Sequence, residues 1–198
     1  FTMQEFDKEI STLITEYGPS SKKIIPKTPN AKSVVIFLKI GTHRAILGAD
    51  LEFKDNNNEG WLNILDYSQV VEKSTLFKVP HHGSSNGYCQ RIWTELLTTN
   101  PIAKLTPWNK NKKLPEVAML RKYSEHTSNL FMTSPIINDK PKNRDKKIEK
   151  IIRKMNLKIR EAKYSMGIIQ NRINIDDPTD LWHTQLYHNA SHVNPQIA

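Results

Sequence analysis

The stretch that most constrains this chain is Lys78–Ser85, which reads KVPHHGSS. The apolar segment before it, Thr75–Val79, is predicted to form a strand that ends at the proline, because proline cannot donate to a sheet ladder. Two imidazoles follow at the mouth of that strand, on a glycine turn. A rigid strand fixes the direction of such a side chain and the turn leaves space for an ion, so the pattern suits a metal ligand.

A second stretch of the same kind lies upstream, at Ala45–Asp50, which reads AILGAD. It is again an apolar strand, a glycine and then a side chain that can bind metal. A single aspartate at a strand end is more often a cap or a turn former, and a histidine pair beside a glycine is more often a polar surface feature. The conjunction of two such strands, one followed by Gly-Ser-Ser, favours a functional site.

Together these two stretches resemble the C-terminal half of a metallo-β-lactamase-fold hydrolase. They are most similar to the branch that includes the hydrolase domain of the DNA-uptake channel of competent bacteria. The similarity continues, less specifically, through Leu105–Trp108, Leu114-Pro115 and Met132–Ser134 to the closing hairpin, so it covers nearly the whole chain from Asn30 on. The resemblance implies an α/β fold, namely the C-terminal half of an αββα metallo-β-lactamase sandwich.

The resemblance also implies roles for individual residues. Asp50 falls on the carboxylate that bridges two metal ions, which its two oxygens allow when the ions are about 3.5–4 Å apart. His82 falls on the last histidine ligand, and His81 would then contact the ligands or the substrate; the alternative assignment of the two imidazoles stays open. Ser84 and Ser85, with the backbone amides of the turn, would hold a phosphate or scissile oxygen. The implied cofactor is a pair of divalent ions, with zinc expected first and manganese as an alternative.

The sequence also departs from the family pattern. The His-x-His-x-Asp-His loop that supplies most of the family's ligands does not occur in it, and the only histidine before the Asp50 motif is His43, in a predicted hairpin turn. A bound metal needs about three or four protein ligands, whereas Asp50 and His82 are two. We therefore expect the other half of the fold to come from a missing N-terminal segment or a complementing chain, and the first residue, Phe1, agrees with that expectation.

Two functions of different classes follow. The first is a metal-dependent hydrolase, a phosphodiesterase or nuclease in which a metal-bound hydroxide attacks the phosphodiester. The second is a degenerate, non-catalytic fold that binds nucleic acid or protein through a basic face. The net charge of +9 and a pI near 9.5 favour polyanionic partners such as nucleic acid. A predicted basic helix at Lys140–Lys163 would supply such a face, although a run of this kind is more often only solvated.

The predicted elements divide one domain segment, 1–198, into three parts: a leading helix and linker (1–32), the region with the metal motifs (33–135), and the basic helix with a terminal hairpin (136–198). Hydrophobic periodicity and turn residues place each element. Strands are predicted at Val34–Ile40 (buried on both faces), Arg44–Leu47, Thr75–Val79, Ile102–Thr106, Leu130–Met132, Met166–Ile173 and Leu181–Tyr187. Helices are predicted at Thr2–Tyr17, Trp61–Tyr67, Asn86–Thr98, Pro115–Tyr123 and Lys140–Lys163.

Cysteine content and hydropathy bear on where the protein is found. Cys89 is the one cysteine, so an internal disulfide is excluded and nothing indicates an oxidising compartment. No apolar run has the length needed to cross a bilayer. We therefore expect a cytoplasmic protein without a membrane partner.

Overall fold

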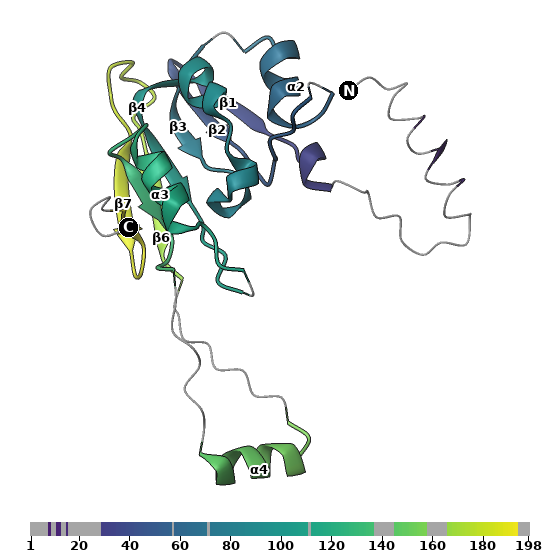
Figure 1. Cartoon of the computed structure of the whole chain (residues 1–198). Coiled ribbons are helices and arrows are strands. Elements are labelled where there is room, and N and C mark those ends of the chain that lie inside the picture. The colour runs from purple at the N-terminus through teal and green to yellow at the C-terminus, as the bar shows by residue number, and fades with distance from the viewer. Residues whose placement is uncertain are drawn as a thin grey trace.

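The computed structural model describes residues 8, 11, 12, 15, 29–56, 58–70, 72–110, 112–136, 145–157 and 166–193 of the 198-residue chain. Within these residues the fold is mixed α/β, which confirms the predicted class (Figure 1). No helix among them is both long enough and apolar enough to cross a membrane. The predicted opening helix, Thr2–Tyr17, lies largely outside the described residues.

The elements follow one another along the chain with short connections. The strands are β1 (Ile36–Ile40), β2 (His43–Leu47), β3 (Ser74–Lys78), β4 (Leu97–Leu105), β5 (Leu130–Met132), β6 (Ile168–Arg172), β7 (His183–Tyr187) and β8 (Ser191–His192). The α-helices are α2 (Gly60–Tyr67), α3 (Val117–Ser124) and α4 (Lys146–Lys154). Short 3-10 segments are η1 (Pro29–Lys32), η2 (His81–Gly83) and η3 (Ser85–Gly87), and η4 (Ile92–Leu96) is a π-helical turn.

Six of the strands form one mixed sheet in the order β1-β2-β3-β4-β5-β8, and β6 and β7 form a separate two-stranded sheet. β1 and β2 make an antiparallel hairpin, β2 to β5 run parallel, and β8 returns antiparallel to β5. The four parallel strands therefore all end at the same edge of the sheet. That edge is where α/β sheets usually carry their binding sites.

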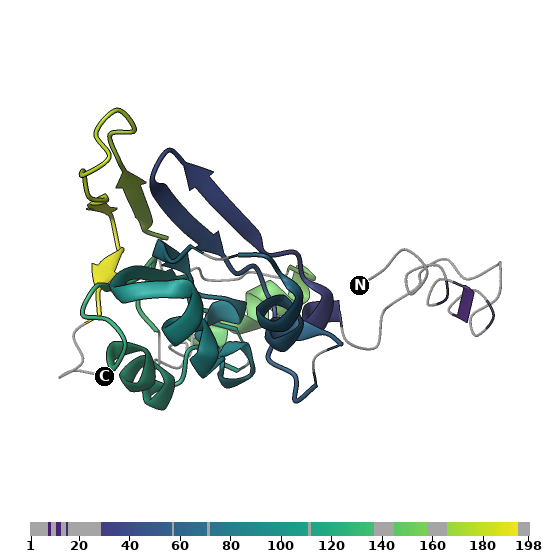
Figure 2. The ribbon, with the colours of Figure 1, turned by 90° about the horizontal axis from the view of Figure 1, so that it is seen from above.

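One face of the six-stranded sheet carries the hydrophobic core. Neighbouring strands place Ile46, Phe77, Ala103 and Leu130 in one row of this face, and all four are buried. Helices α2 and α3 cover the row (Figure 2). Trp61 of α2, which is 0% exposed, meets the Phe77 ring edge-on at 6.3 Å. Burial of such aromatic side chains contributes much of the stability of a domain of this size.

The opposite face of the sheet is covered in part by the β6–β7 hairpin (Figure 2). The indole Nε1 of Trp182 donates to Thr75 Oγ1 at 2.8 Å, and Lys104 Nζ donates to Asn171 Oδ1 at 2.7 Å. Polar contacts as well as apolar ones therefore connect the two sheets. The row of this face nearest the strand ends consists of Leu47, Lys78, Lys104 and Phe131.

The strand predicted at Val34–Ile40 is shorter than expected and is not buried on both faces. β1 begins at Ile36 and lies at the edge of the sheet, where Ile36 is 51% and Leu38 is 41% exposed. A continuous apolar run is typical of a central strand, but the same run also fits an edge strand. The prediction of two buried faces is wrong because only the face of Phe37 packs against the core, whereas the face of Ile36 and Leu38 is left uncovered.

The single helix predicted at Asn86–Thr98 is also wrong in extent. The chain makes the turn η3, then the π-helical turn η4, and the strand β4 already begins at Leu97. Ile92, Trp93 and Leu96 are buried against the core as their spacing suggests. One turn is enough to bury these three side chains, so their periodicity did not require a longer helix.

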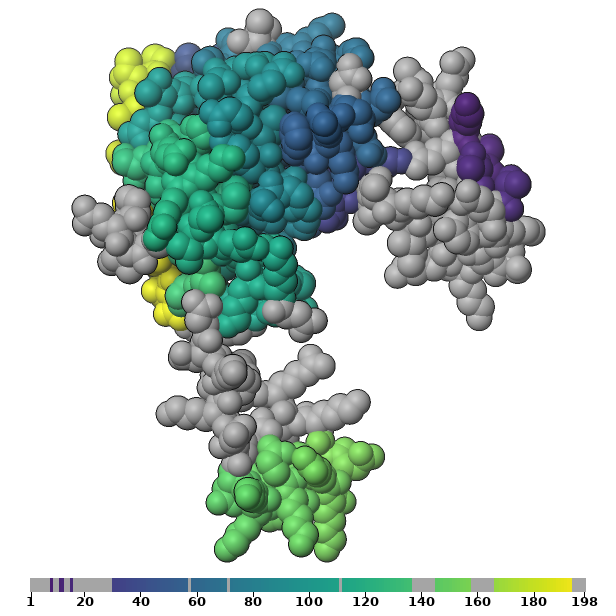
Figure 3. All heavy atoms as spheres, viewed as in Figure 1, coloured from purple at the N-terminus to yellow at the C-terminus, as the bar shows by residue number. Residues whose placement is uncertain are grey.

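The basic helix is confirmed over part of its predicted range, as α4, and the rest of Lys140–Lys163 lies mostly outside the described residues. Asp145 caps its first turn by accepting from the Lys147 amide at 2.7 Å. Most of the apolar stripe is solvent-exposed: Ile148 is 51%, Ile151 56% and Met155 62% exposed, and only Ile152 is buried. In Figures 1 and 3, α4 lies away from the two sheets.

Candidate functional site

Two loops meet at the edge where the parallel strands end. The Gly48 amide donates to the carbonyl of Lys78 at 3.0 Å, and the His81 amide donates to the carbonyl of Ala49 at 3.0 Å. A side chain at Gly48 would bring its Cβ to 2.9 Å from the Lys78 oxygen, so only glycine allows this approach. The loops that carry Asp50 and His82 are therefore held together by their backbones.

The backbone of these loops adopts conformations that side chains seldom allow. Ala49 has a φ of 45°, and His81, His82 and Gly83 follow one another at 45°, 55° and 71°. Left-handed backbone at a non-glycine residue costs on the order of 1–3 kcal/mol and tends to occur at functional sites. The three left-handed residues His81, His82 and Gly83 in succession turn the chain sharply after β3 and fix the directions of both imidazoles.

The His82 imidazole is oriented by the backbone of the neighbouring strand end. Its Nδ1 lies 2.8 Å from the carbonyl oxygen of Thr106. A carbonyl only accepts, so Nδ1 carries the proton and Nε2 keeps its lone pair. No hydrogen-bond partner for that Nε2 is found among the described residues, and the Trp108 ring packs at 5.1 Å from the imidazole. Histidines that bind metals are usually held in this way.

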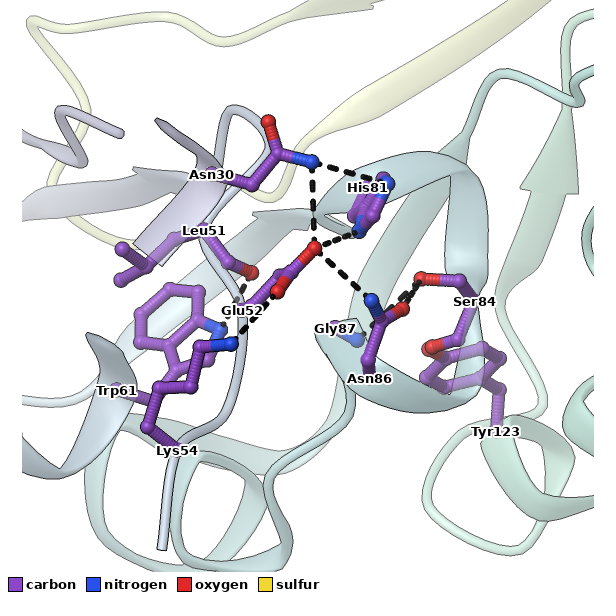
Figure 4. Close-up of polar contacts among 10 residues, drawn as sticks. All are labelled: Asn30, Leu51, Glu52, Lys54, Trp61, His81, Ser84, Asn86, Gly87 and Tyr123. Atoms are coloured by element: carbon purple, nitrogen blue, oxygen red, sulfur yellow. Dashed lines mark hydrogen bonds and ion pairs between the residues drawn. The ribbon is translucent and has the colours of Figure 1, made fainter. Parts of the chain in front are cut away.

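The His81 imidazole instead turns into a polar network (Figure 4). Its Nδ1 lies 3.2 Å from Glu52 Oε1, and its Nε2 lies 3.3 Å from Asn30 Nδ2. An amide nitrogen only donates, so Nε2 accepts and the ring proton sits on Nδ1, facing the carboxylate. The Nδ1–Glu52 contact does not meet hydrogen-bond geometry, and this buried nitrogen has no other partner in the described part of the chain. The contact is therefore an electrostatic attraction between the Nδ1–H group and the Glu52 carboxylate.

Glu52 is the centre of that network. Besides His81, its Oε1 accepts from Asn30 Nδ2 at 3.2 Å and from Asn86 Nδ2 at 2.9 Å, and its Oε2 lies 3.2 Å from Lys54 Nζ (Figure 4). No sequence pattern indicated a role for Glu52, because it lies in a polar, asparagine-rich segment between predicted elements. Its position two residues after Asp50 was the available signal.

The two serines differ in exposure. Ser84 is 3% exposed, and its hydroxyl donates to Asn86 Oδ1 at 2.5 Å and accepts from the Gly87 amide at 3.3 Å. Ser85 is exposed. The Ser84 hydroxyl thus stabilises the turn through hydrogen bonds within it (Figure 4). Ser85, in contrast, is exposed to solvent.

Asp50 lies exposed in the loop after β2, and its carboxylate interacts electrostatically with Lys78. Burial lowers the pKa of the Lys78 ammonium, the Asp50 carboxylate opposes that effect, and Lys104 adds to it. The strand ends therefore combine the exposed carboxylate of Asp50 with the partly buried ammonium groups of Lys78 and Lys104.

These residues fit a metal only in part. His82 Nε2 and the Asp50 carboxylate are suitable donors, yet the described residues contain no group of three or more His, Cys, Asp or Glu side chains placed to hold an ion. His43 does not add a third ligand: it begins β2, while Asp50 follows the end of that strand, roughly 20 Å along an extended chain. Its Nε2 donates to the Asp177 carbonyl at 3.3 Å, away from the strand ends.

The structure thus brings together the loops of Asp50, His81, His82, Ser84 and Ser85, which the sequence pointed to, and adds Glu52, Asn30 and the Thr106 carbonyl. What it does not add is a third metal-binding side chain among the described residues. Comparison of the chain with protein-family profiles, with curated proteins and with solved structures finds no match.

Proposed function

We propose that this chain is one half of a metal-dependent phosphodiesterase or nuclease whose remaining ligands come from an N-terminal segment or a second chain. The observation that carries the proposal is the hydrogen bond from His82 Nδ1 to the Thr106 carbonyl, which leaves Nε2 free at the edge where four parallel strands end. The metallo-β-lactamase-like αββα sandwich expected from the sequence is part of the same proposal.

In this proposal Asp50 and His82 would hold a pair of divalent ions, zinc or manganese. When bound, the metal would activate water and stabilise charge on the phosphoryl oxygens. The chain itself keeps His82 in one tautomer through the Thr106 carbonyl, and it holds the β2 and β3 loops together through the Gly48 and His81 amides. A fixed tautomer and a fixed loop lower the cost of ordering the site.

The residues beside the ligands have different parts in the proposal. His81, with both ring nitrogens facing Glu52 and Asn30, supports the turn that carries His82 and lies next to the substrate. The Ser85 hydroxyl is open to a substrate oxygen, and Ser84 acts through the backbone of the turn. The free, buried Cys89 agrees with a cytoplasmic location.

The test is hydrolysis of bis(4-nitrophenyl) phosphate by the protein as isolated, with any accompanying chain retained and with zinc or manganese added. Asp50→Ala and His82→Ala should each lower the rate by more than about 100-fold, because replacing even a group that orients a ligand costs about 10–100-fold. His183→Ala is the matched control, since His183 is exposed and pairs with Asp180 at 3.1 Å, and its rate should equal the wild-type rate.

Unchanged turnover in both Asp50→Ala and His82→Ala would refute the hydrolase. The non-catalytic alternative would then gain support if the protein bound nucleic acid in the presence of a chelator and released it with added salt. The lysine-rich surface of α4 would be the contact in that case, because binding through phosphate contacts weakens steeply with salt.

A further inference from the structure

Two lysines lie side by side on the sheet face that is only partly covered, next to the strand ends. Lys78 ends β3, Lys104 lies in β4, and the two are register partners, so their side chains leave the same face. Leu47 flanks the pair on one side and Phe131 on the other. The two lysines therefore occupy neighbouring positions of one row, with an apolar residue on each side of the pair.

Neither lysine has a carboxylate within 4.0 Å among the described residues. Lys78 Nζ donates only to the Val79 carbonyl, at 3.2 Å, and Lys104 Nζ donates to the Asn171 amide oxygen at 2.7 Å. Burial lowers the pKa of both lysines. Two like charges that are partly buried and have no carboxylate in direct contact among the described residues cost stability, and an arrangement that keeps them together is a candidate binding site.

The Lys104 side chain is also held in a fixed direction. Its acceptor, Asn171, belongs to β6, and the Asn171 amide nitrogen donates to Thr184 Oγ1 of β7 at 2.8 Å. This second hydrogen bond sets which end of the Asn171 amide faces the lysine. The β6–β7 hairpin thus positions the Lys104 side chain through Asn171. The Val79 carbonyl, directly after β3, positions the Lys78 side chain.

We propose that Lys78 and Lys104 together form a binding subsite for a phosphoryl group. An ammonium is a compact point charge that binds phosphate oxygens well, and each of these two has N–H donors beyond the single acceptor it contacts. The pair lies under the same strand ends as Asp50, so a phosphate on it would sit beside the proposed metal ligands. The choice of phosphate rests on the proposed function; the positive subsite itself rests on the two lysines.

The test is calorimetric titration of the metal-free protein, in a chelator, with inorganic phosphate. Lys78→Met and Lys104→Met should each weaken binding by about tenfold or more, because each removes a charged hydrogen-bond donor. Lys78→Arg keeps the charge and should retain most of the affinity. Lys73→Met is the matched control: Lys73 immediately precedes β3, at the opposite end from Lys78, and its Nζ donates to the Thr94 carbonyl at 2.6 Å.

A second measurement on the unaltered protein covers the case in which a methionine variant fails to fold. The side-chain nitrogen resonances of Lys78 and Lys104 should shift with added phosphate, and that of Lys73 should not. Absence of saturable binding, or binding that is equal in Lys78→Met, Lys104→Met and Lys73→Met, would overturn the subsite. Since no metal or turnover is involved, phosphate binding without hydrolysis would leave the subsite standing while the proposed hydrolase failed.

Discussion

At the scale of single side chains, His81 and His82 are adjacent but have different surroundings. His82 has one nitrogen fixed by the Thr106 carbonyl, and His81 has both nitrogens beside protein groups. The left-handed backbone at both residues turns successive side chains in different directions. This difference favours His82 as the ligand and His81 as a residue that positions the turn.

Glu52 provides a test of the network that holds His81. Glu52→Ala would leave the amide donors of Asn30 and Asn86 without their shared acceptor and would remove the carboxylate beside His81 Nδ1, so the unfolding free energy should fall by about 1–3 kcal/mol. Glu116→Ala, which removes an exposed pair with Lys112, should change it by less than about 0.5 kcal/mol. Urea unfolding measures both, and equal losses would contradict a central role for Glu52.

His126 should make stability depend on pH. Burial lowers the pKa of His126 from 6.5, with an opposing effect from Glu125 and a further lowering from Lys122. The unfolded chain therefore takes up the proton first, and this residue costs stability as the pH falls below 6.5. His126→Phe keeps an aromatic ring on Trp93, which stacks at 4.8 Å.

Urea unfolding above and below that pH, on the wild type and on His126→Phe, separates His126 from the other histidines. The variant should lose less stability on acidification than the wild type. An equal or larger loss in the variant would show that the partly buried His126 imidazole is not the cause.

At the scale of elements, the close approach of β2 and β3 depends on Gly48. Gly48→Ala would place a Cβ 2.9 Å from the Lys78 oxygen and 3.0 Å from the Pro80 Cβ, so the two loops would have to separate. We expect a loss of about 1–3 kcal/mol in unfolding free energy, as for other overpacked sites. Ser85→Ala, at an exposed residue of the same edge, is the control and should be nearly neutral. A neutral Gly48→Ala would mean that the loops tolerate separation.

Most strands were predictable from the sequence in position, whereas β4 begins at Leu97 rather than at the predicted Ile102. β3 and β5 agree with their predicted ranges to within a residue, because short apolar runs bounded by proline or turn residues leave few alternatives. The exposure of Ile36 and Leu38 in β1 could not be predicted, since it depends on which elements pack over that face of the sheet. The two-residue β8 carries no pattern of its own and exists through pairing with β5.

The candidate site was predictable to a similar extent. Asp50 and His82 follow apolar strands, and that position alone suggested a shared edge. The roles of Glu52 and the Thr106 carbonyl depend on contacts between loops far apart in sequence, and a backbone carbonyl has no signature in sequence at all. Lys78 is part of the Lys78–Ser85 stretch, but its position beside Lys104 follows only from the register of β3 with β4.

At the scale of the whole molecule, the two faces of the main sheet differ in cover. Helices α2 and α3 bury one face, whereas a two-stranded hairpin covers part of the other and leaves Ile36 and Leu38 exposed (Figure 2). Within the described residues, no group of three or more His, Cys, Asp or Glu side chains is placed to hold an ion at the strand ends.

The most direct test of the central claim is a zinc titration of the protein as isolated, followed through the imidazole nitrogen resonances. We predict that zinc shifts the Nε2 resonance of His82 while Nδ1 keeps its proton and its hydrogen bond to the Thr106 carbonyl. Asp50→Asn should remove the shift, because in the proposal both residues bind the same metal centre. If His82 is unchanged when zinc is bound, or if its shift persists in Asp50→Asn, then Asp50 and His82 do not form a shared metal site.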